Sequence, residues 1–219
     1  MTIMNDTLLQ ENVLAELLFE PSLDAAQVTA TVKNGVVTLS GSVSNYPEKW
    51  AAERAVKRVL GVAGVAEELV VNFRSSTQHS DEDIVGAARR ALEWSVTVPK
   101  KSVQIRVEDG WVTLEGMVEW QFQRQDAHNV VAHLLGVKGV SNMITLKPQV
   151  TSADVHTNIK AAFKRSSDLD AGRVQVEVEG SKITLRGTLP NWTEIDAAGL
   201  AAWNAAGVTM VDNQIHIGL

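Results

Sequence analysis

The chain has no cysteine, one tyrosine and four phenylalanines among its 219 residues. The lack of cysteine excludes disulfide bonds, thiolate nucleophiles and cysteine-ligated metal sites. No apolar run approaches the length of about 18 residues that crosses a bilayer, so we expect no transmembrane segment. Basic residues are also scarce, with 20 Lys and Arg against 26 Asp and Glu and a net charge of −6. Because nucleic-acid binding relies on neutralising phosphates, we predict no nucleic-acid partner.

The first residues lack the marks of a secretion signal. Residues 1–8 contain neither a basic segment nor the apolar run that follows one in a signal peptide. We therefore expect a cytoplasmic protein. If a signal had been removed from the natural protein, the expected location would be the periplasm.

Catalytic and metal-binding patterns are missing as well. No two histidines stand four residues apart on one expected helix, and neither H-E-x-x-H nor G-x-S-x-G occurs. The histidines are His79, His128, His133, His156 and His216. We predict a protein that is not an enzyme and that uses no cofactor and no metal ion.

What the sequence does contain is one ten-residue pattern in three copies. The copies span residues 32–41, 107–116 and 178–187. Each alternates apolar and polar residues on both sides of a two-residue turn, which predicts a β-hairpin. The turns are Asn34-Gly35, Asp109-Gly110 and Gly180-Ser181. The first two pairs suit a type I′ turn, and Gly-Ser suits type II′.

The same offsets, 75 and 71 residues, relate the flanking segments. Before each hairpin, apolar residues recur every four positions, which predicts a helix with one buried face. These residues are Leu9, Val13 and Leu17, then Ile84, Ala88 and Leu92, then Val155, Ile159 and Phe163. The expected N-caps of these helices are Asn5, Ser80 and Thr151. A second helix and a short apolar strand follow each hairpin.

The predicted fold is therefore α+β, with three tandem α-β-β-α-β modules. Each module has a three-stranded mixed sheet covered on one face by two helices. The expected boundaries are residues 1–74, 77–148 and 149–219. Recurring glycines mark turns, helix ends and one position on the buried face of the second strand, where a covering helix or a bulge would require glycine. The structural glycines are Gly35, Gly41, Gly61, Gly110, Gly116, Gly136, Gly187 and Gly207.

This order of elements resembles the BON domain. The similarity lies in V-x-x-G-x-V-x-L-x-G between two helices, the second of which ends in G-V-x-x-V. The third copy departs from the pattern at Ser181 and Met210. BON domains occur in bacterial osmotically inducible and outer-membrane-associated proteins. The resemblance implies a non-enzymatic, transport-associated or osmotic-stress protein that binds phospholipid surfaces.

The six tryptophans do not recur between modules, which favours contacts with a partner or another module over roles in the core. Trp94 lies two residues after Leu92, so it faces away from the buried stripe. Arg90 is one turn earlier, a spacing that permits a cation–π contact. A basic and aromatic surface of this kind suits anionic lipid headgroups. The predicted lipid-binding residues are Arg89, Arg90, Trp94, Lys100 and Lys101. The alternative is that Trp94 is buried against a neighbouring module.

Two functions remain open at this point. The first is binding of anionic phospholipid at a membrane surface. The alternative is a protein–protein scaffold or a holdase-like stress protector that acts through exposed sheet faces. The expected outer face is uncharged in the first module, at Thr29, Thr31, Val36, Thr38 and Val70. It is mixed in the third, at Gln175, Glu177, Lys182, Thr184 and Arg186.

Overall fold

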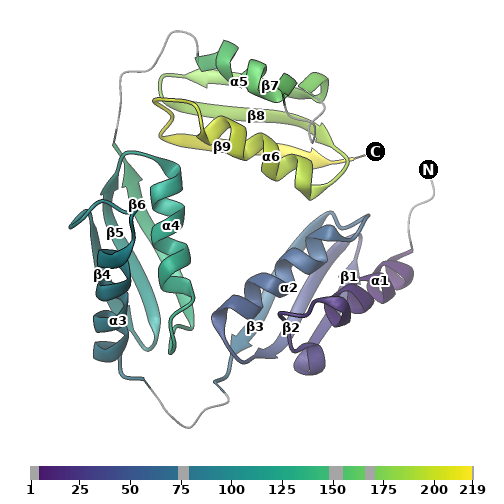
Figure 1. Cartoon of the computed structure of the whole chain (residues 1–219). Helices are drawn as coiled ribbons and strands as arrows, with labels where there is room; N and C mark the ends of the chain where they lie inside the picture. Colours follow the sequence, from purple (N-terminus) through teal and green to yellow (C-terminus); the bar gives the residue numbers. More distant parts are fainter. Residues whose placement is uncertain (1–4, 74–78, 148–154, 166–170, 219) are drawn as a thin grey trace. The chain divides into compact units, whose positions relative to one another are not determined.

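A computed structural model describes residues 5–73, 79–147, 155–165 and 171–218 (Figure 1). The chain forms two compact units. The first comprises residues 1–118 and 122–145, and the second comprises residues 119–121 and 146–219. The expected N-cap Thr151 lies outside the described residues. Among the described residues, no helix combines the length and apolar character needed to span a bilayer.

Each repeat has two helices and three strands. The first contains α1 (Asp6–Phe19), β1 (Val28–Lys33), β2 (Val36–Val43), α2 (Tyr46–Arg58) and β3 (Gly64–Val71). The second contains α3 (Asp81–Trp94), β4 (Val103–Glu108), β5 (Trp111–Val118), α4 (Gln121–Ala132) and β6 (Gly139–Leu146). The third contains α5 (Val155–Arg165), β7 (Val174–Glu179), β8 (Lys182–Leu189), α6 (Trp192–Trp203) and β9 (Met210–Ile217). Short 3₁₀ turns, Ala25–Gln27 and Ala171–Arg173, precede β1 and β7. The predicted α+β architecture is confirmed.

The middle strand of each sheet is the second strand of its repeat. In the first repeat, β2 pairs antiparallel with β1 and parallel with β3, and β8 pairs in the same way with β7 and β9. Both helices of a repeat lie on one face of its sheet (Figure 1). The first strand of every repeat is therefore an edge strand, with one side free of ladder hydrogen bonds to its own sheet.

The cores follow the predicted apolar stripes. All nine stripe residues of the first helices are at most 8% exposed. They pack against alternate residues of the hairpin strands, such as Val37 and Leu39 in the first repeat and Ile183 and Leu185 in the third. In the third repeat the second helix buries mainly alanine, at Ala198 and Ala202. The 3.6-residue and two-residue periods thus locate the buried faces.

One expectation about glycine is wrong in its detail. Gly41, Gly116 and Gly187 have φ of 114°, 137° and 151°, but Gly41 is exposed and the other two are half-buried. The close neighbour is not a covering helix. A Cβ at Gly116 would collide with the carbonyl oxygen of Ser102, just before β4, and the sister glycines face Gln27 and Arg173 in the same way. The backbone that enters the edge strand leaves no room for a side chain.

A carboxylate that the sequence patterns did not single out holds the hairpin turn to the first helix. Asp6 accepts hydrogen bonds from the backbone N–H groups of Asn34 and Gly35, at 2.8 and 3.1 Å. Asp81 does the same in the second repeat, with 2.8 Å bonds from Asp109 and Gly110. Both turn residues have positive φ in each case, as a type I′ turn requires. Each aspartate is the first residue of its helix, where negative charge is also favoured by the helix dipole.

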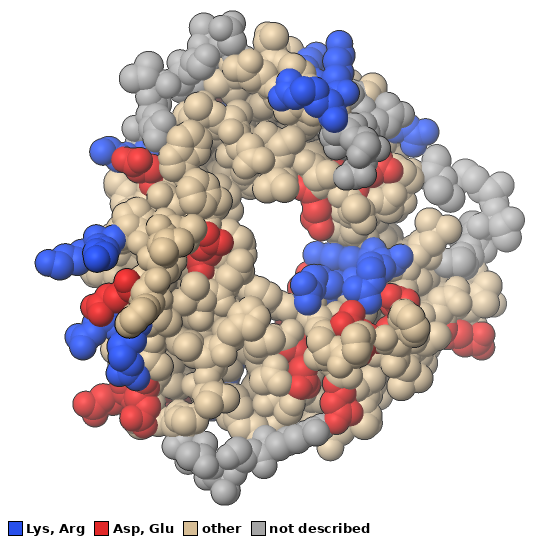
Figure 2. Space-filling view, viewed as in Figure 1, with Lys and Arg blue, Asp and Glu red and all other residues tan. Residues whose placement is uncertain are grey.

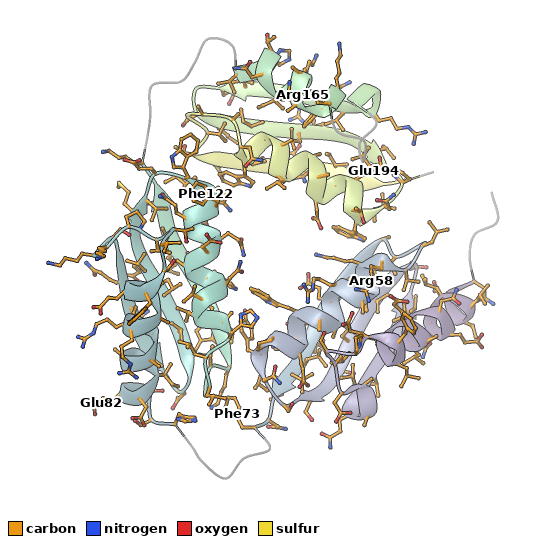
Figure 3. The ribbon with its side chains drawn as sticks, viewed as in Figure 1. Arg58, Phe73, Glu82, Phe122, Arg165 and Glu194 are labelled. Atoms are coloured by element: carbon orange, nitrogen blue, oxygen red, sulfur yellow. The ribbon has the colours of Figure 1, made fainter. Side chains whose placement is uncertain are left out.

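Arg58, at the end of α2, joins the two helices of the first repeat (Figure 3). Its Nε and Nη2 atoms lie 2.8 Å from carboxylate oxygens of Glu16 and Glu20. Glu20 also accepts a 2.6 Å hydrogen bond from the Ser22 hydroxyl. Hydrogen bonds from Ser22 and Arg58 lower the pKa of Glu20 to about 2.

This shift predicts a pH-dependent contribution to stability. A carboxylate whose pKa is lower in the folded protein stabilises the fold above its unfolded pKa, and the contribution disappears as pH falls from about 4.5 towards 2. We expect Glu20→Gln to lower the free energy of unfolding by about 1 kcal/mol at pH 7, since Arg58 is half-exposed and solvent screens the pair. Thermal melts of the variant and the parent should differ at pH 7 and converge near pH 2. A difference that persists at pH 2 would mean that Glu20 acts through packing and not through its charge.

Candidate functional site

The second repeat has a hollow of about 1070 Å³ between the C-terminal half of α3 and the edge strand β4. Apolar side chains form its floor, namely Leu92, Val98, Val103 and Ile105. Its rim carries Arg89, Trp94, Val96, Lys100 and Lys101. Trp94 and Val96 are 86% and 99% exposed, so two large apolar groups project into solvent beside three cations. We refer to this feature as the α3–β4 hollow.

A tight turn presents the two lysines. The Ser102 N–H donates to the Pro99 carbonyl oxygen at 3.2 Å, which closes a four-residue turn with Lys100 and Lys101 at its centre. Lys101 has a φ of 63°, a left-handed conformation that normally selects glycine or asparagine at this place in a turn. Such backbone conformations cost free energy and persist only where the surrounding structure holds them, and they are concentrated at functional sites.

Comparison with the first repeat explains why the hollow is open. There, Leu14 and Ala25 pack over the core next to β1, and Val28 and Ala30 of that strand are 7% and 3% exposed. At the offset of 75 residues, Leu14 and Ala25 become Arg89 and Lys100. Two apolar covering groups are thus replaced by cations whose charged ends stay in water.

The third repeat keeps its edge strand covered by a different residue. Phe163 is fully buried and corresponds to Leu92 of the second repeat. Val174 and Val176 of β7 are accordingly 4% and 7% exposed. Their counterparts in the second repeat, Val103 and Ile105, are only half-buried. Within the described residues, the hollow thus lies beside the edge strand whose inward residues are the least covered.

The structure brings together four of the five residues predicted to bind lipid: Arg89, Trp94, Lys100 and Lys101 all line the α3–β4 hollow. Arg90 does not line it. Its guanidinium lies next to Gly86, one turn towards the start of α3, and not over the indole of Trp94. Trp94 is 86% exposed, and its burial against a neighbouring module stays an untested alternative.

Charge is distributed unevenly along α3. Its first turn carries Asp81, Glu82 and Asp83, whereas Arg89 and Arg90 lie in its second half, before a last turn that contains Glu93. Figure 3 labels Glu82 at the acidic end, and Figure 2 shows acidic side chains at that end of the second repeat with Lys and Arg side chains further along. The hollow therefore lies at the basic end of the repeat, although the whole chain is acidic.

An exposed aromatic residue at the end of the first helix also occurs in the first repeat, where it is a phenylalanine and not a tryptophan. Phe19 corresponds to Trp94 and is 80% exposed, next to Leu18 at 77%. The third repeat has the exposed Arg165 at this position (Figure 3). The feature that recurs between the first two repeats is therefore an aromatic side chain at this position, phenylalanine in one and tryptophan in the other.

The positive φ of Lys101 predicts opposite effects on stability for glycine substitutions at the two lysines of the turn. We expect Lys101→Gly to raise the free energy of unfolding by about 0.5–1 kcal/mol, because relief of a left-handed residue exceeds the entropic cost of glycine. Lys100→Gly removes the same charge at a residue without positive φ and should lower stability instead. Chemical denaturation of both variants measures the difference. Equal losses in the two variants would show that the turn at Lys101 is not strained.

Comparisons with known proteins found a sequence relative and solved structures that match the chain. The chain is 28% identical over 150 residues to osmotically-inducible protein Y of Escherichia coli (strain K12), covering 66% of this chain and 74% of that protein. Two solved structures of CdsD, described as a structural protein of the type III secretion system of Chlamydia trachomatis, are also similar. They are 17% and 16% identical, each with a TM-score of 0.27. The matches cover 95% and 99% of this chain, and 91% and 100% of those chains.

The expectation of a cytoplasmic protein is wrong. Osmotically-inducible protein Y is periplasmic, and this similarity does not support a cytoplasmic location. The N-terminal residues misled the prediction, since a location cannot be inferred from the point at which a sequence begins.

The family assignment rests on all three repeats. The BON domain pattern matches residues 5–72, 80–148 and 151–218, so each match spans one set of two helices and three strands. The related Escherichia coli protein is, by its name, osmotically inducible. As the resemblance in the hairpins and helix ends predicted, the chain belongs to the BON domain family.

Proposed function

We propose that this protein is a non-enzymatic binding protein that attaches to anionic phospholipid at a membrane surface through the α3–β4 hollow. The observation that supports this most directly is the exposure of Trp94 and Val96 beside Arg89, Lys100 and Lys101. BON proteins are in general non-enzymatic, which agrees with a role in binding.

The chemistry of the rim suits a membrane interface. Tryptophan is favoured at the headgroup level of bilayers, where its ring is partly in an apolar medium and its N–H remains solvated. Each lysine or arginine near an anionic surface contributes about 1 kcal/mol. Three rim cations against one acidic lining residue, Glu93, leave the site positive in a chain of net charge −6. Attraction of this part of the molecule would orient the second repeat towards the membrane.

Co-sedimentation with vesicles tests the proposal. The full chain should bind vesicles that contain phosphatidylglycerol and should bind pure phosphatidylcholine vesicles at least tenfold more weakly. Binding should fall when the salt concentration rises from about 0.05 to 0.5 M, since the screening length then shortens to a few ångströms. Equal binding to both vesicle types, or binding that salt does not change, would contradict the electrostatic part of the proposal. No binding to either would overturn it.

Arg90 provides a matched control. It is on the same helix as Arg89 and carries the same charge, but it does not line the hollow. Arg89→Ala should therefore weaken vesicle binding more than Arg90→Ala. Equal effects would indicate that only the net charge of the repeat matters.

A second candidate function, a protein-binding surface, is supported by the outer face of the second sheet. Trp111, Met117 and Met143 are 48%, 52% and 61% exposed there. The Trp111 indole N–H donates to the Ser141 hydroxyl at 2.9 Å, and its ring lies over Gly139. By contrast, the outer face of the third sheet carries ion pairs, including Arg186 with Glu177 at 2.7 Å.

Substitution on this outer face distinguishes the two candidates. Met143→Glu places a charge on the sheet far in sequence from the hollow residues. It should leave vesicle binding unchanged if the hollow binds lipid. If it abolished vesicle binding while the fold stayed intact, the membrane contact would have to be assigned to the sheet.

A further inference from the structure

The size of the α3–β4 hollow exceeds what a surface contact with headgroups needs. A side chain that only touches a membrane requires no cavity, yet this hollow has about 1070 Å³ and an apolar floor. Sites for small ligands typically measure about 300–1000 Å³ and combine an apolar lining with a few polar groups. The α3–β4 hollow is therefore large enough for part of a lipid molecule.

The floor and the rim differ in chemistry, which limits the class of ligand. Leu92, Val98 and the two β4 residues Val103 and Ile105 offer only apolar surface. The cations lie at the mouth, two of them on the turn that leads into β4. A ligand that satisfies both parts has one apolar chain and one anionic head. A wholly polar ligand would gain no hydrophobic contact with the floor. A wholly apolar ligand would desolvate the lysine ammonium groups without offering them a charged partner.

Without a ligand, the apolar floor leaves hydrophobic side chains of β4 partly exposed to water, which is unfavourable. Val103 and Ile105 are half-buried, whereas their counterparts in the other two repeats are at least 93% buried. Burying them under an alkyl chain would recover about 25 cal/mol for each Å² of apolar surface removed from water. The sister repeats show that the same strand position can be closed by Leu14 or by Phe163. The second repeat lacks such a closing side chain, and a ligand chain can take its place.

We infer that the α3–β4 hollow takes up the single acyl chain of an anionic lysophospholipid, with the phosphate held at the mouth by Arg89, Lys100 and Lys101. This inference rests on the proposed function and extends it from attachment at a bilayer to binding of one lipid molecule. Arginine and lysine both bind phosphate well, arginine through paired N–H groups and lysine as a compact charge. The exposed indole of Trp94 then packs along the part of the chain that leaves the hollow.

Titration with lysophosphatidylglycerol below its critical micelle concentration tests the inference, with calorimetry as the readout. We expect saturable binding of one molecule per chain. Lysophosphatidylcholine of the same chain length should bind at least tenfold more weakly, because its head has no net charge. Laurate provides an anionic chain without phosphate, and we expect it to bind more weakly than lysophosphatidylglycerol. Equal affinity for laurate would overturn the assignment of phosphate at the mouth.

Leu92→Phe is the decisive variant, because it introduces the residue that the third repeat buries at the same position. It narrows the hollow without changing any charge, and it should weaken lysophosphatidylglycerol binding at least tenfold while vesicle binding persists. Val103→Thr, which keeps the shape of the floor but makes it polar, is the second variant and should also weaken binding. Circular dichroism confirms that each variant is folded.

The outcomes separate the two proposals. Vesicle binding without binding of monomeric lysophosphatidylglycerol would overturn the inference and leave the proposed function in place. Unchanged monomer binding in both folded variants would also overturn it. Failure to bind monomers and vesicles alike would overturn the proposed function together with the inference.

Discussion

Gly116→Ala is expected to unfold or strongly destabilise the second repeat, with a loss of about 3 kcal/mol or more in the free energy of unfolding. Gly116 has a φ of 137°, which L-residues rarely adopt, and a Cβ at this position would collide with the Ser102 carbonyl oxygen. The neighbouring atom is backbone, and the Met117 N–H also donates to it at 3.2 Å. Relief would require the entry to β4 to move. Left-handed strain and overpacking each cost about 1–3 kcal/mol.

Gly86→Ala is the control within the same repeat. Gly86 lies inside α3, and the nearest atom to its added Cβ is the flexible guanidinium of Arg90 at 3.4 Å. Alanine inside a helix is favoured over glycine by about 0.5–1 kcal/mol, so this variant should gain stability. Urea denaturation followed by circular dichroism measures both. A Gly116→Ala variant as stable as the parent would show that the strand entry can shift freely.

The triple variant Trp94→Ala, Lys100→Gln, Lys101→Gln is expected to lose vesicle binding by at least 100-fold. Two lysines near an anionic surface contribute about 2 kcal/mol together. Insertion of roughly half of the tryptophan surface, about 100 Å², contributes a further 2 kcal/mol or so. The sum exceeds the 2.7 kcal/mol or so that corresponds to a 100-fold change in affinity. Co-sedimentation with phosphatidylglycerol vesicles measures the change.

The triple variant should nevertheless remain folded. Trp94 is 86% exposed and both lysines are exposed, so none of the three is part of the core. The thermal midpoint is therefore expected to stay within a few degrees of the parent. The corresponding change in the first repeat, Phe19→Ala, is the control for loss of an exposed aromatic without loss of lysines. A large fall in the midpoint of the triple variant would mean that these residues support the fold, and the binding result would then not identify a site.

The amino-acid sequence by itself determined the repeat architecture. Periodicity placed Leu9, Val13 and Leu17 and their counterparts on buried helix faces, and Asn-Gly and Asp-Gly located the type I′ turns. These features are local, because a helix face and a two-residue turn depend on residues within a few positions of one another. Proximity along the chain likewise sufficed to group Arg89, Trp94, Lys100 and Lys101, which are all within 13 residues.

Only the tertiary structure decided what those residues surround. The α3–β4 hollow exists because Arg89 and Lys100 replace the covering Leu14 and Ala25 while Leu92 stays smaller than Phe163, a difference that matters only where helix and edge strand pack together. The Gly116 contact with Ser102 and the Asp81 bonds to the turn 28 and 29 residues away are likewise not visible in any local period. Volume and close approach depend on side chains from separate elements meeting in space, and a pattern read along one strand or helix does not contain that information.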